Sequence, residues 1–176
     1  MKRILTVIVN DQVGVLNRIT GLFLRRGYNI DSITVGGTET KGLSRMTIVV
    51  NVAREEDIEQ VIKQLYKQID VIKVTDITNV PAVARELVMI KILSSPQNRS
   101  EVMDLIQPFR ASVIDVARDN ITIQATGDTD KIEALIEVLK PYGIKEMART
   151  GVTAFKRGLE RKGEVTSLNQ NQATSL

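Results

Sequence analysis

The sequence predicts an α+β fold built from two tandem βαββαβ domains. Two observations lead to this prediction. Short β-branched apolar runs alternate with segments whose apolar residues recur every three or four positions, and the order strand, helix, strand, strand, helix, strand occurs twice. This order is that of the ferredoxin-like sandwich, in which two helices cover one face of an antiparallel sheet.

The first domain is predicted over residues 1–78. Its strands are expected at residues 3–10, 29–38, 43–52 and 71–78. The first helix ends at Gly27 and carries the apolar stripe Val15, Leu16, Ile19, Leu22 and Phe23. The second helix, over residues 55–69, begins with three acidic residues and carries the stripe Ile58, Val61, Ile62, Leu65 and Ile69.

The second domain is predicted over residues 87–158, after a linker at residues 79–86 that contains Pro81. Its strands are expected at residues 87–93, 112–117, 120–126 and 144–150. A short helix is expected at residues 100–109. A further helix carries Ile132, Leu135, Ile136 and Leu139 and ends before Pro141 and Gly143. The polar tail, residues 159–176, is expected to be disordered.

The composition excludes several classes of function. The chain has no Cys and no His, which rules out disulfides, Cys/His metal sites, thiol nucleophiles and His-assisted triads. The net charge is only +3, and there are three Phe, three Tyr and no Trp, so we expect no nucleic-acid binding. No run approaches the roughly 20 apolar residues of a membrane span, and the first residues predict a strand, so we expect a cytoplasmic protein that does not bind membranes.

The corner between the first strand and the first helix, at residues 11–16, is the candidate binding site. Gly14 can take a positive φ, and the amides of Gly14, Val15 and Leu16 lie at a helix N-terminus with few internal partners. Such a corner suits a carboxylate or a phosphate. The alternative is that Gly14 only makes the turn and Asp11 only caps the helix, which is the better interpretation of such a corner in isolation.

Several motifs in order along the chain resemble one protein family. An Asp-x-x-Gly turn after the first strand, here residues 11–14, resembles the ACT domain, a small amino-acid-sensing module of metabolic enzymes. The runs GLFLRRGYNIDSITVGGTE, LSRMTIVV, IDVARDNITIQATG and EMARTGVTAFKRG are similar to the regulatory (small) subunits of acetolactate synthase, also called acetohydroxyacid synthase. The resemblance covers residues 1–158.

The resemblance implies a non-catalytic subunit that acts through a separate catalytic (large) subunit. That partner carries thiamine diphosphate, FAD and Mg²⁺, and condenses pyruvate with a second 2-oxo acid in branched-chain amino-acid (valine, leucine, isoleucine) biosynthesis. The regulatory subunit raises the partner's activity and confers feedback inhibition by valine. The chain itself is expected to hold no cofactor, no metal and no catalytic residue. The alternative is an ACT-type regulator of another metabolic enzyme.

The effector-binding residues implied by the resemblance are Asp11, Val13, Gly14, Val15, Leu16, Asn29 and Ile30. The helix-start amides would bind the carboxylate of an amino acid, and Asp11 or the carbonyl of Asn29 would accept from its ammonium group. Val13, Val15 and Ile30 are expected to line the apolar part of the pocket. Some family members carry Asn where this chain has Asp11.

Family resemblance also implies that the effector lies between two ACT domains paired through their second strands. In the ferredoxin-like order the second and fourth strands are edges, and residues 29–38 carry no Lys or Pro to block pairing, whereas the fourth strand carries Lys73 and Asp76. We therefore expect a homodimer. A free-standing enzyme would need a catalytic motif and a transcription factor a helix-turn-helix, and the sequence shows neither.

Overall fold

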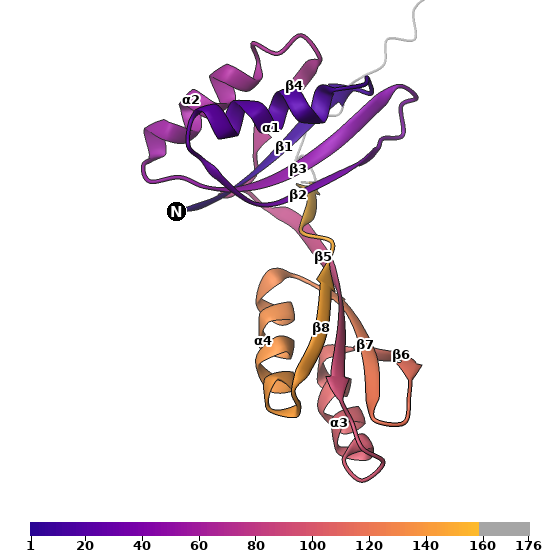
Figure 1. The fold of residues 1–176 in the computed structure, drawn as a ribbon. Coiled ribbons are helices and arrows are strands. Elements are labelled where there is room, and N and C mark those ends of the chain that lie inside the picture. Colours follow the sequence, from indigo (N-terminus) through magenta and orange to yellow (C-terminus); the bar gives the residue numbers. More distant parts are fainter. Residues whose placement is uncertain (159–176) are drawn as a thin grey trace, which may run out of the picture.

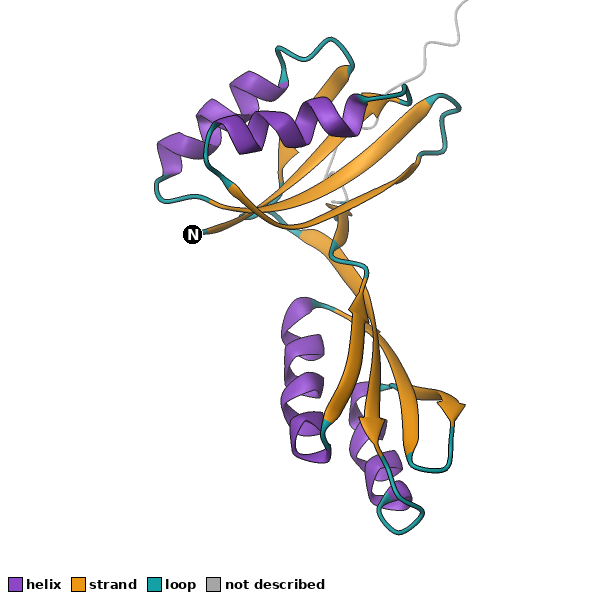
Figure 2. Ribbon diagram, in the orientation of Figure 1, coloured by secondary structure: helices purple, strands orange, loops and turns teal. Residues whose placement is uncertain are grey.

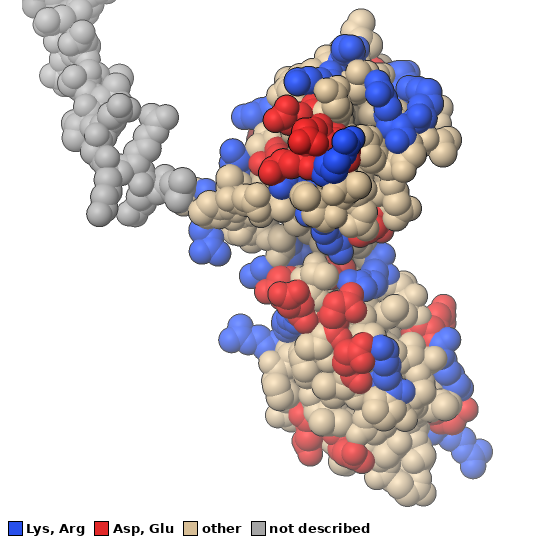
Figure 3. Space-filling model, turned by 90° about the vertical axis from the view of Figure 1, so that its left-hand side faces the viewer, with Lys and Arg blue, Asp and Glu red and all other residues tan. Residues whose placement is uncertain are grey.

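The computed structural model describes residues 1–158 as two α+β units arranged end to end (Figure 1). A two-stranded ribbon connects them, and the space-filling view narrows at this level (Figure 3). Each unit has the predicted order of strands and helices, which confirms the fold class of two tandem ferredoxin-like βαββαβ domains. The predicted tail, residues 159–176, lies outside the described residues.

The first unit contains four strands and two helices. They are β1 (Lys2–Asn10), α1 (Val15–Arg25), β2 (Asn29–Gly37), β3 (Leu43–Asn51), α2 (Glu55–Leu65) and β4 (Val71–Asp76). The strands lie antiparallel in the order β2-β3-β1-β4, so β2 and β4 are the edges, as predicted. Both helices cover one face of this sheet (Figure 2).

The core of the first unit lies between the helices and the sheet. Leu5, Val7 and Val9 of β1 are fully or almost fully buried there because alternate residues of a strand share one face. The helices contribute Val15, Ile19, Leu22, Phe23, Ile58, Val61 and Leu65. The predicted stripes are thus mostly correct, and they fix which side of α1 is left to solvent.

Ile69 is an exception to the predicted pattern. We expected it on the buried stripe of a helix that continues to residue 69, but α2 ends at Leu65 and Ile69 is 91% exposed. The chain turns after Leu65, and the hydroxyl of Tyr66 donates to the carbonyl oxygen of Val74 and accepts from its N–H, both at 3.1 Å. The helix thus ends one turn earlier than the hydrophobic spacing predicted, and Tyr66 links its C-terminal end to β4.

The second unit repeats the arrangement. Its elements are β5 (Ala82–Leu93), α3 (Arg99–Ile106), the 3₁₀ turn η1 (Gln107–Phe109), β6 (Ser112–Val116), β7 (Asn120–Gly127), α4 (Thr129–Leu139), η2 (Lys140–Tyr142) and β8 (Ile144–Arg149). The strands lie antiparallel in the order β6-β7-β5-β8. A separate core, with Ile90, Ile123 and Leu135 fully buried, lies between this sheet and its helices.

The ribbon between the units replaces most of the predicted linker. Residues 82–86 belong to β5, and Ala82 to Arg85 pair with a strand that the sequence did not predict, β9 (Thr153–Lys156). The apolar side chains of Val152 and Ala154 pack with Val49 and Ile77 on the helix-free side of the first sheet. Four residues are too few for the alternation of apolar and polar side chains to predict a strand from the sequence.

Candidate functional site

The corner between β1 and α1 is held by backbone hydrogen bonds. The N–H of Asp11 donates to the carbonyl oxygen of Gly42 at 2.8 Å, which ties the corner to the turn between β2 and β3. The N–H of Asn10 donates to the carbonyl oxygen of Asp70 at 2.9 Å, which ties the corner to the turn that precedes β4. Asp11 itself is exposed. It does not cap α1, whose N-cap residue is Gly14 and whose first turn has no side-chain cap.

Gly14 immediately precedes α1 with a φ of +84°, in the left-handed region that glycine enters most readily. The N–H of Val15 donates to the carbonyl oxygen of Gln12 at 3.3 Å, and the N–H of Arg18 donates to that of Gly14 at 3.0 Å. Within residues 1–158 the amides of Gly14 and Leu16 have no hydrogen-bond partner. The amides of Val13 and Asn17 have none in this part of the chain either. Several unpaired donors therefore lie at the positive end of a helix dipole, which attracts a carboxylate.

Arg18 adds positive charge beside these amides. A Cβ placed on Gly14 would lie 3.1 Å from Nη1 of Arg18, so the guanidinium covers one side of the turn. Arg18 also forms an ion pair with Asp70. Sequence reasoning missed this residue, although its position one helical turn after Gly14 was a usable signal.

The apolar residues of the predicted site are placed differently from one another. Val13 is 99% exposed and Leu16 is 44% exposed, so both side chains are available beside the corner. Val15, which we expected to line the apolar part of the pocket, is 4% exposed and packs in the core. Ile30 packs partly against the same core.

Asn29 and Ile30 lie at the other end of the sheet from this corner. Asn29 is opposite Asn51, which is also opposite Lys2 at the start of β1, whereas the corner follows Asn10 at the end of β1. The eight residue steps between Lys2 and Asn10 span about 26 Å at roughly 3.3 Å per residue. One chain therefore does not bring Asn29 together with Asp11 and Gly14.

The side chain of Asn29 is oriented by its neighbour. Its Nδ2 donates to Oδ1 of Asp31 at 3.1 Å, and Asn51 donates to the same oxygen at 2.7 Å. In the part of the chain that the structure describes, the side-chain carbonyl oxygen of Asn29 has no donor. It can therefore accept a hydrogen bond from an ammonium group.

Two general features of the described residues bear on the kind of site. None of their helices is long and apolar enough to cross a membrane, and no group of three His, Cys, Asp or Glu side chains among them is arranged to hold a metal ion. Acidic and basic side chains are interspersed over both units on the face shown in Figure 3. The corner is thus a site of hydrogen-bond donors and one helix dipole.

Comparisons with known proteins agree along nearly the whole described chain. A family model described as "AHAS small subunit-like ACT domain" matches residues 5–73, and one described as "Small subunit of acetolactate synthase" matches residues 85–158. The acetolactate synthase small subunit of Bacillus subtilis is 64% identical over 162 residues, which cover 92% of this chain and 94% of that protein. The one from Aquifex aeolicus is 51% identical, with 93% and 85% covered.

A solved structure extends this agreement to three dimensions. The crystal structure of the acetolactate synthase small subunit from Thermotoga maritima matches with a TM-score of 0.83 at 40% identity, covering 90% of this chain and 99% of that one. Identity at this level and over this length shows common descent, and the two family models divide the chain as its two units do. The chain therefore belongs to the family of acetolactate synthase small subunits, and its first unit is an ACT domain of that family.

Proposed function

We propose that the chain is the regulatory subunit of an acetolactate synthase, that it activates the catalytic subunit, and that it confers feedback inhibition by valine. The observation that supports this most directly is the corner at Gly14, where several unpaired amides lie at the positive end of a helix dipole. The catalytic partner holds thiamine diphosphate, FAD and Mg²⁺ and carries out the condensation of pyruvate with a second 2-oxo acid. We place both subunits in the cytoplasm.

The valine carboxylate binds the amides of Gly14 and Leu16 beside Arg18 in this proposal. The ammonium group needs an acceptor, which Asp11 and the carbonyl oxygen of Asn29 supply. The isopropyl group packs against Val13, whose side chain is otherwise fully exposed. Ile30 closes the apolar side of the pocket.

A second copy of the chain is needed to complete this site. β2 is an edge strand of nine residues whose central residue is Ile33. If two copies pair antiparallel about Ile33, Asn29 of one copy lies opposite Gly37 of the other. Gly37 is opposite Ser44 of β3, at the end of the sheet where Asp11 is tied to Gly42. Pairing through β2 therefore brings the two separated halves of the predicted site together.

Reconstitution tests the proposed function. The purified chain is expected to form no acetolactate from pyruvate with thiamine diphosphate and Mg²⁺, to raise the rate when the catalytic subunit is added, and to make that rate sensitive to valine. Acetolactate production by this chain alone would contradict a regulatory role. No effect on the catalytic subunit would favour the alternative, an ACT-type regulator of another enzyme. Activation that no branched-chain amino acid modulates would contradict the feedback role.

Gly14→Asp tests the site. Asp tolerates a positive φ better than most residues, so the turn is expected to form, but its carboxylate repels the carboxylate of valine. Coupling between sites is typically about 1 to 3 kcal/mol, so losing one charged contact is enough to remove inhibition while activation remains. Gly14→Asn is the matched control, because it has the same size and tolerance of φ without the charge. A folded Gly14→Asp protein inhibited at the wild-type valine concentration would place the site elsewhere.

A further inference from the structure

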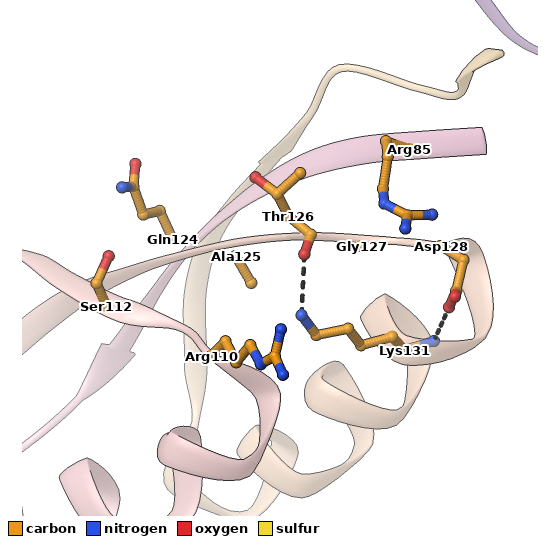
Figure 4. Close-up of a pocket in the computed structure, with 9 residues that line it drawn as sticks. All are labelled: Arg85, Arg110, Ser112, Gln124, Ala125, Thr126, Gly127, Asp128 and Lys131. Carbon is orange, nitrogen blue, oxygen red and sulfur yellow. Dashed lines mark hydrogen bonds between the residues drawn. The ribbon is translucent and has the colours of Figure 1, made fainter. Parts of the chain in front are cut away.

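The second unit contains a polar pocket of about 290 Å³ between β5, the turn after η1 and the turn from β7 into α4 (Figure 4). Three basic side chains line it, those of Arg85, Arg110 and Lys131. Asp128 is the one acidic residue in the lining, so the formal charges sum to +2. The pocket belongs to the unit that does not contain the Gly14 corner.

The three basic residues have no acidic partner among residues 1–158. The described ion pairs include none of them. Lys131 donates from Nζ to the carbonyl oxygen of Thr126 at 2.9 Å, and Arg85 donates to the carbonyl oxygen of Ala84 at 2.7 Å. The carboxylate of Asp128 accepts from the backbone N–H of Lys131 at 2.9 Å, where it caps α4. Cations that gather without counter-charges attract an anion.

Gly127 allows Lys131 to reach this pocket. A Cβ on Gly127 would lie 2.6 Å from Cδ of Lys131, so any side chain there would push the lysine away. The backbone of Gly127 is not in the left-handed region, so the turn itself does not require glycine. Because Gly127 has no side chain, the side chain of Lys131 can cross this turn and direct its ammonium group toward Arg110 (Figure 4).

Arg110 is held in an unfavourable backbone conformation. Its φ is +51°, and it is the one non-glycine residue with a positive φ in the described part of the chain. It ends η1, and its N–H donates to the carbonyl oxygen of Gln107 at 2.8 Å. Glycine would fit this position without strain, so a role of the guanidinium in binding would account for an arginine there.

The walls of the pocket set the chemistry of the ligand. Ser112, Gln124 and Thr126 also line the pocket, but their hydroxyl and amide groups point away from Lys131 and Arg110 (Figure 4). No aromatic ring lines the pocket to stack on a nucleotide base. Its volume is at the small end of the range for ligand sites. Two guanidinium groups and one ammonium group around a small space suit a small anion such as a tetrahedral oxyanion.

We propose that this pocket binds the phosphate group of a small ligand, either inorganic phosphate or a short phosphorylated metabolite. Arg85 lies on the part of β5 that pairs with β9, so the ligand also contacts the ribbon between the two units. The site is separate from the corner at Gly14, and phosphate binding is independent of the proposed response to valine.

The test is a titration of the full-length protein with inorganic phosphate, followed by ¹⁵N NMR at constant ionic strength. The amides of Ser112, Gly127 and Lys131 are expected to shift together and to saturate. Arg110→Gln and Lys131→Gln are each expected to weaken binding at least tenfold. Lys140→Gln, at the other end of α4, is the matched control and is expected to bind like the wild type. Absence of saturable shifts, or equal loss in Lys140→Gln, would overturn the proposal.

Arg110→Gly separates binding from folding. It removes the guanidinium and also relieves the positive φ, so the variant is expected to melt at a higher temperature than the wild type and yet to lose phosphate binding. A higher melting temperature with unchanged binding would overturn the role of Arg110. Unchanged valine inhibition in this variant is expected, because the corner at Gly14 is untouched.

Two further ligands identify the source of the phosphate group. Glycerol 3-phosphate that binds at least tenfold tighter than inorganic phosphate would assign the pocket to a phosphorylated metabolite, and equal affinities would assign it to phosphate itself. Succinate, a dianion without a phosphate group, is expected to bind at least tenfold more weakly. Succinate binding as tight as that of both phosphates would overturn the assignment to a phosphate group.

Discussion

The two units share an element order and a sheet topology, but their first strand-to-helix corners differ. In the first unit the chain passes from β1 to α1 through Gly14, and several amides of this corner, those of Gly14 and Leu16 among them, have no hydrogen-bond partner in the described residues. In the second unit the corner between β5 and α3 is filled by Arg99, whose Nη2 donates to the carbonyl oxygens of Ser94 at 3.3 Å, Ala117 at 2.8 Å and Arg118 at 3.3 Å.

This difference separates the roles of two similar frameworks. An open corner with unpaired donors can bind a ligand, whereas a corner whose carbonyl groups already accept from an internal guanidinium is satisfied without one. The edges differ in the same sense. β2 has nine residues, whereas β6 has five, although both contain one register shift against the neighbouring strand. A shared fold therefore does not imply a shared site.

The largest effect is expected from Val35→Asp, which tests whether β2 is the dimer edge. Val35 is 48% exposed, and pairing about Ile33 places it opposite Asp31 of the second copy, where like charges repel. Two valines would also leave the interface, at about 1.5 kcal/mol or more each, so we expect the dimer to weaken about 100-fold. Analytical ultracentrifugation measures this.

Ile114→Asp is the matched variant in the second unit. Ile114 lies in β6 and is 46% exposed, so it presents a similar apolar area on the other edge. We expect its dimer constant to equal that of the wild type. A dimer that survives Val35→Asp but is lost in Ile114→Asp would show that the chains associate through β6 and not through β2. The basis for a valine site shared by two β2 strands would then be lost.

The next largest effect is expected from Arg99→Ala, which opens the second corner. Three carbonyl groups lose a charged donor, and hydrogen bonds to charged groups contribute about 1.5 to 3 kcal/mol. We expect the second unit to lose stability by this amount while the valine response is unchanged. Native-state hydrogen exchange reports each unit separately. Arg118→Ala, an exposed arginine in the next turn, is the control and is expected to exchange like the wild type.

A smaller effect is expected from Asn29→Ala. The ammonium donor is charged, so removing this hydrogen bond at an exposed residue costs about 1.5 kcal/mol, the low end for such bonds, which raises the inhibitory valine concentration about tenfold. Ser112→Ala removes a hydroxyl of the second unit and is expected to leave inhibition unchanged. Equal inhibition curves for Asn29→Ala and the wild type would exclude Asn29 from the valine site.

The sequence was most informative where a structure depends on neighbouring residues. The stripe of α1, the edge position of β2 and the turn at Gly14 follow from spacing and from one glycine, and the structure has each of them. Resemblance added Asn29 to the site, but the residue lies at the far end of the same sheet. Its distance from Gly14 depends on how β1, β2 and β3 pair, which no local pattern records.

Other features depended on distant contacts. β9 exists because Thr153 to Lys156 pair with the start of β5, and the C-terminal end of α2 is held against β4 by the bond between Tyr66 and Val74. The pocket in the second unit combines Arg85, Arg110 and Lys131 from three separate segments. Each of these residues is an ordinary surface cation in the sequence, and only the folded chain shows that they share one space.

The smallest effect is expected from lowering the pH. The comparison is between α2 and α4, each of which follows the third strand of its unit. The carboxylate of Asp57 accepts from the backbone N–H of Arg54 at 2.9 Å, and this bond, with the Arg54 guanidinium, holds the pKa of Asp57 below its ordinary value. A lowered pKa in the folded state means that the contribution of Asp57 to stability is present above the unfolded pKa, about 4, and is lost as the pH falls through the folded pKa.

Hydrogen exchange, corrected for the intrinsic rate, measures the opening of α2. This opening is therefore expected to increase from pH 5 to pH 3 in the wild type and to depend less on pH in Asp57→Asn. In the second unit Asp128 caps α4 at the N-cap, where Asn caps as well as Asp, so Asp128→Asn is expected to leave α4 unchanged at pH 7. The same acid dependence of α2 in Asp57→Asn as in the wild type would show that another group controls this helix.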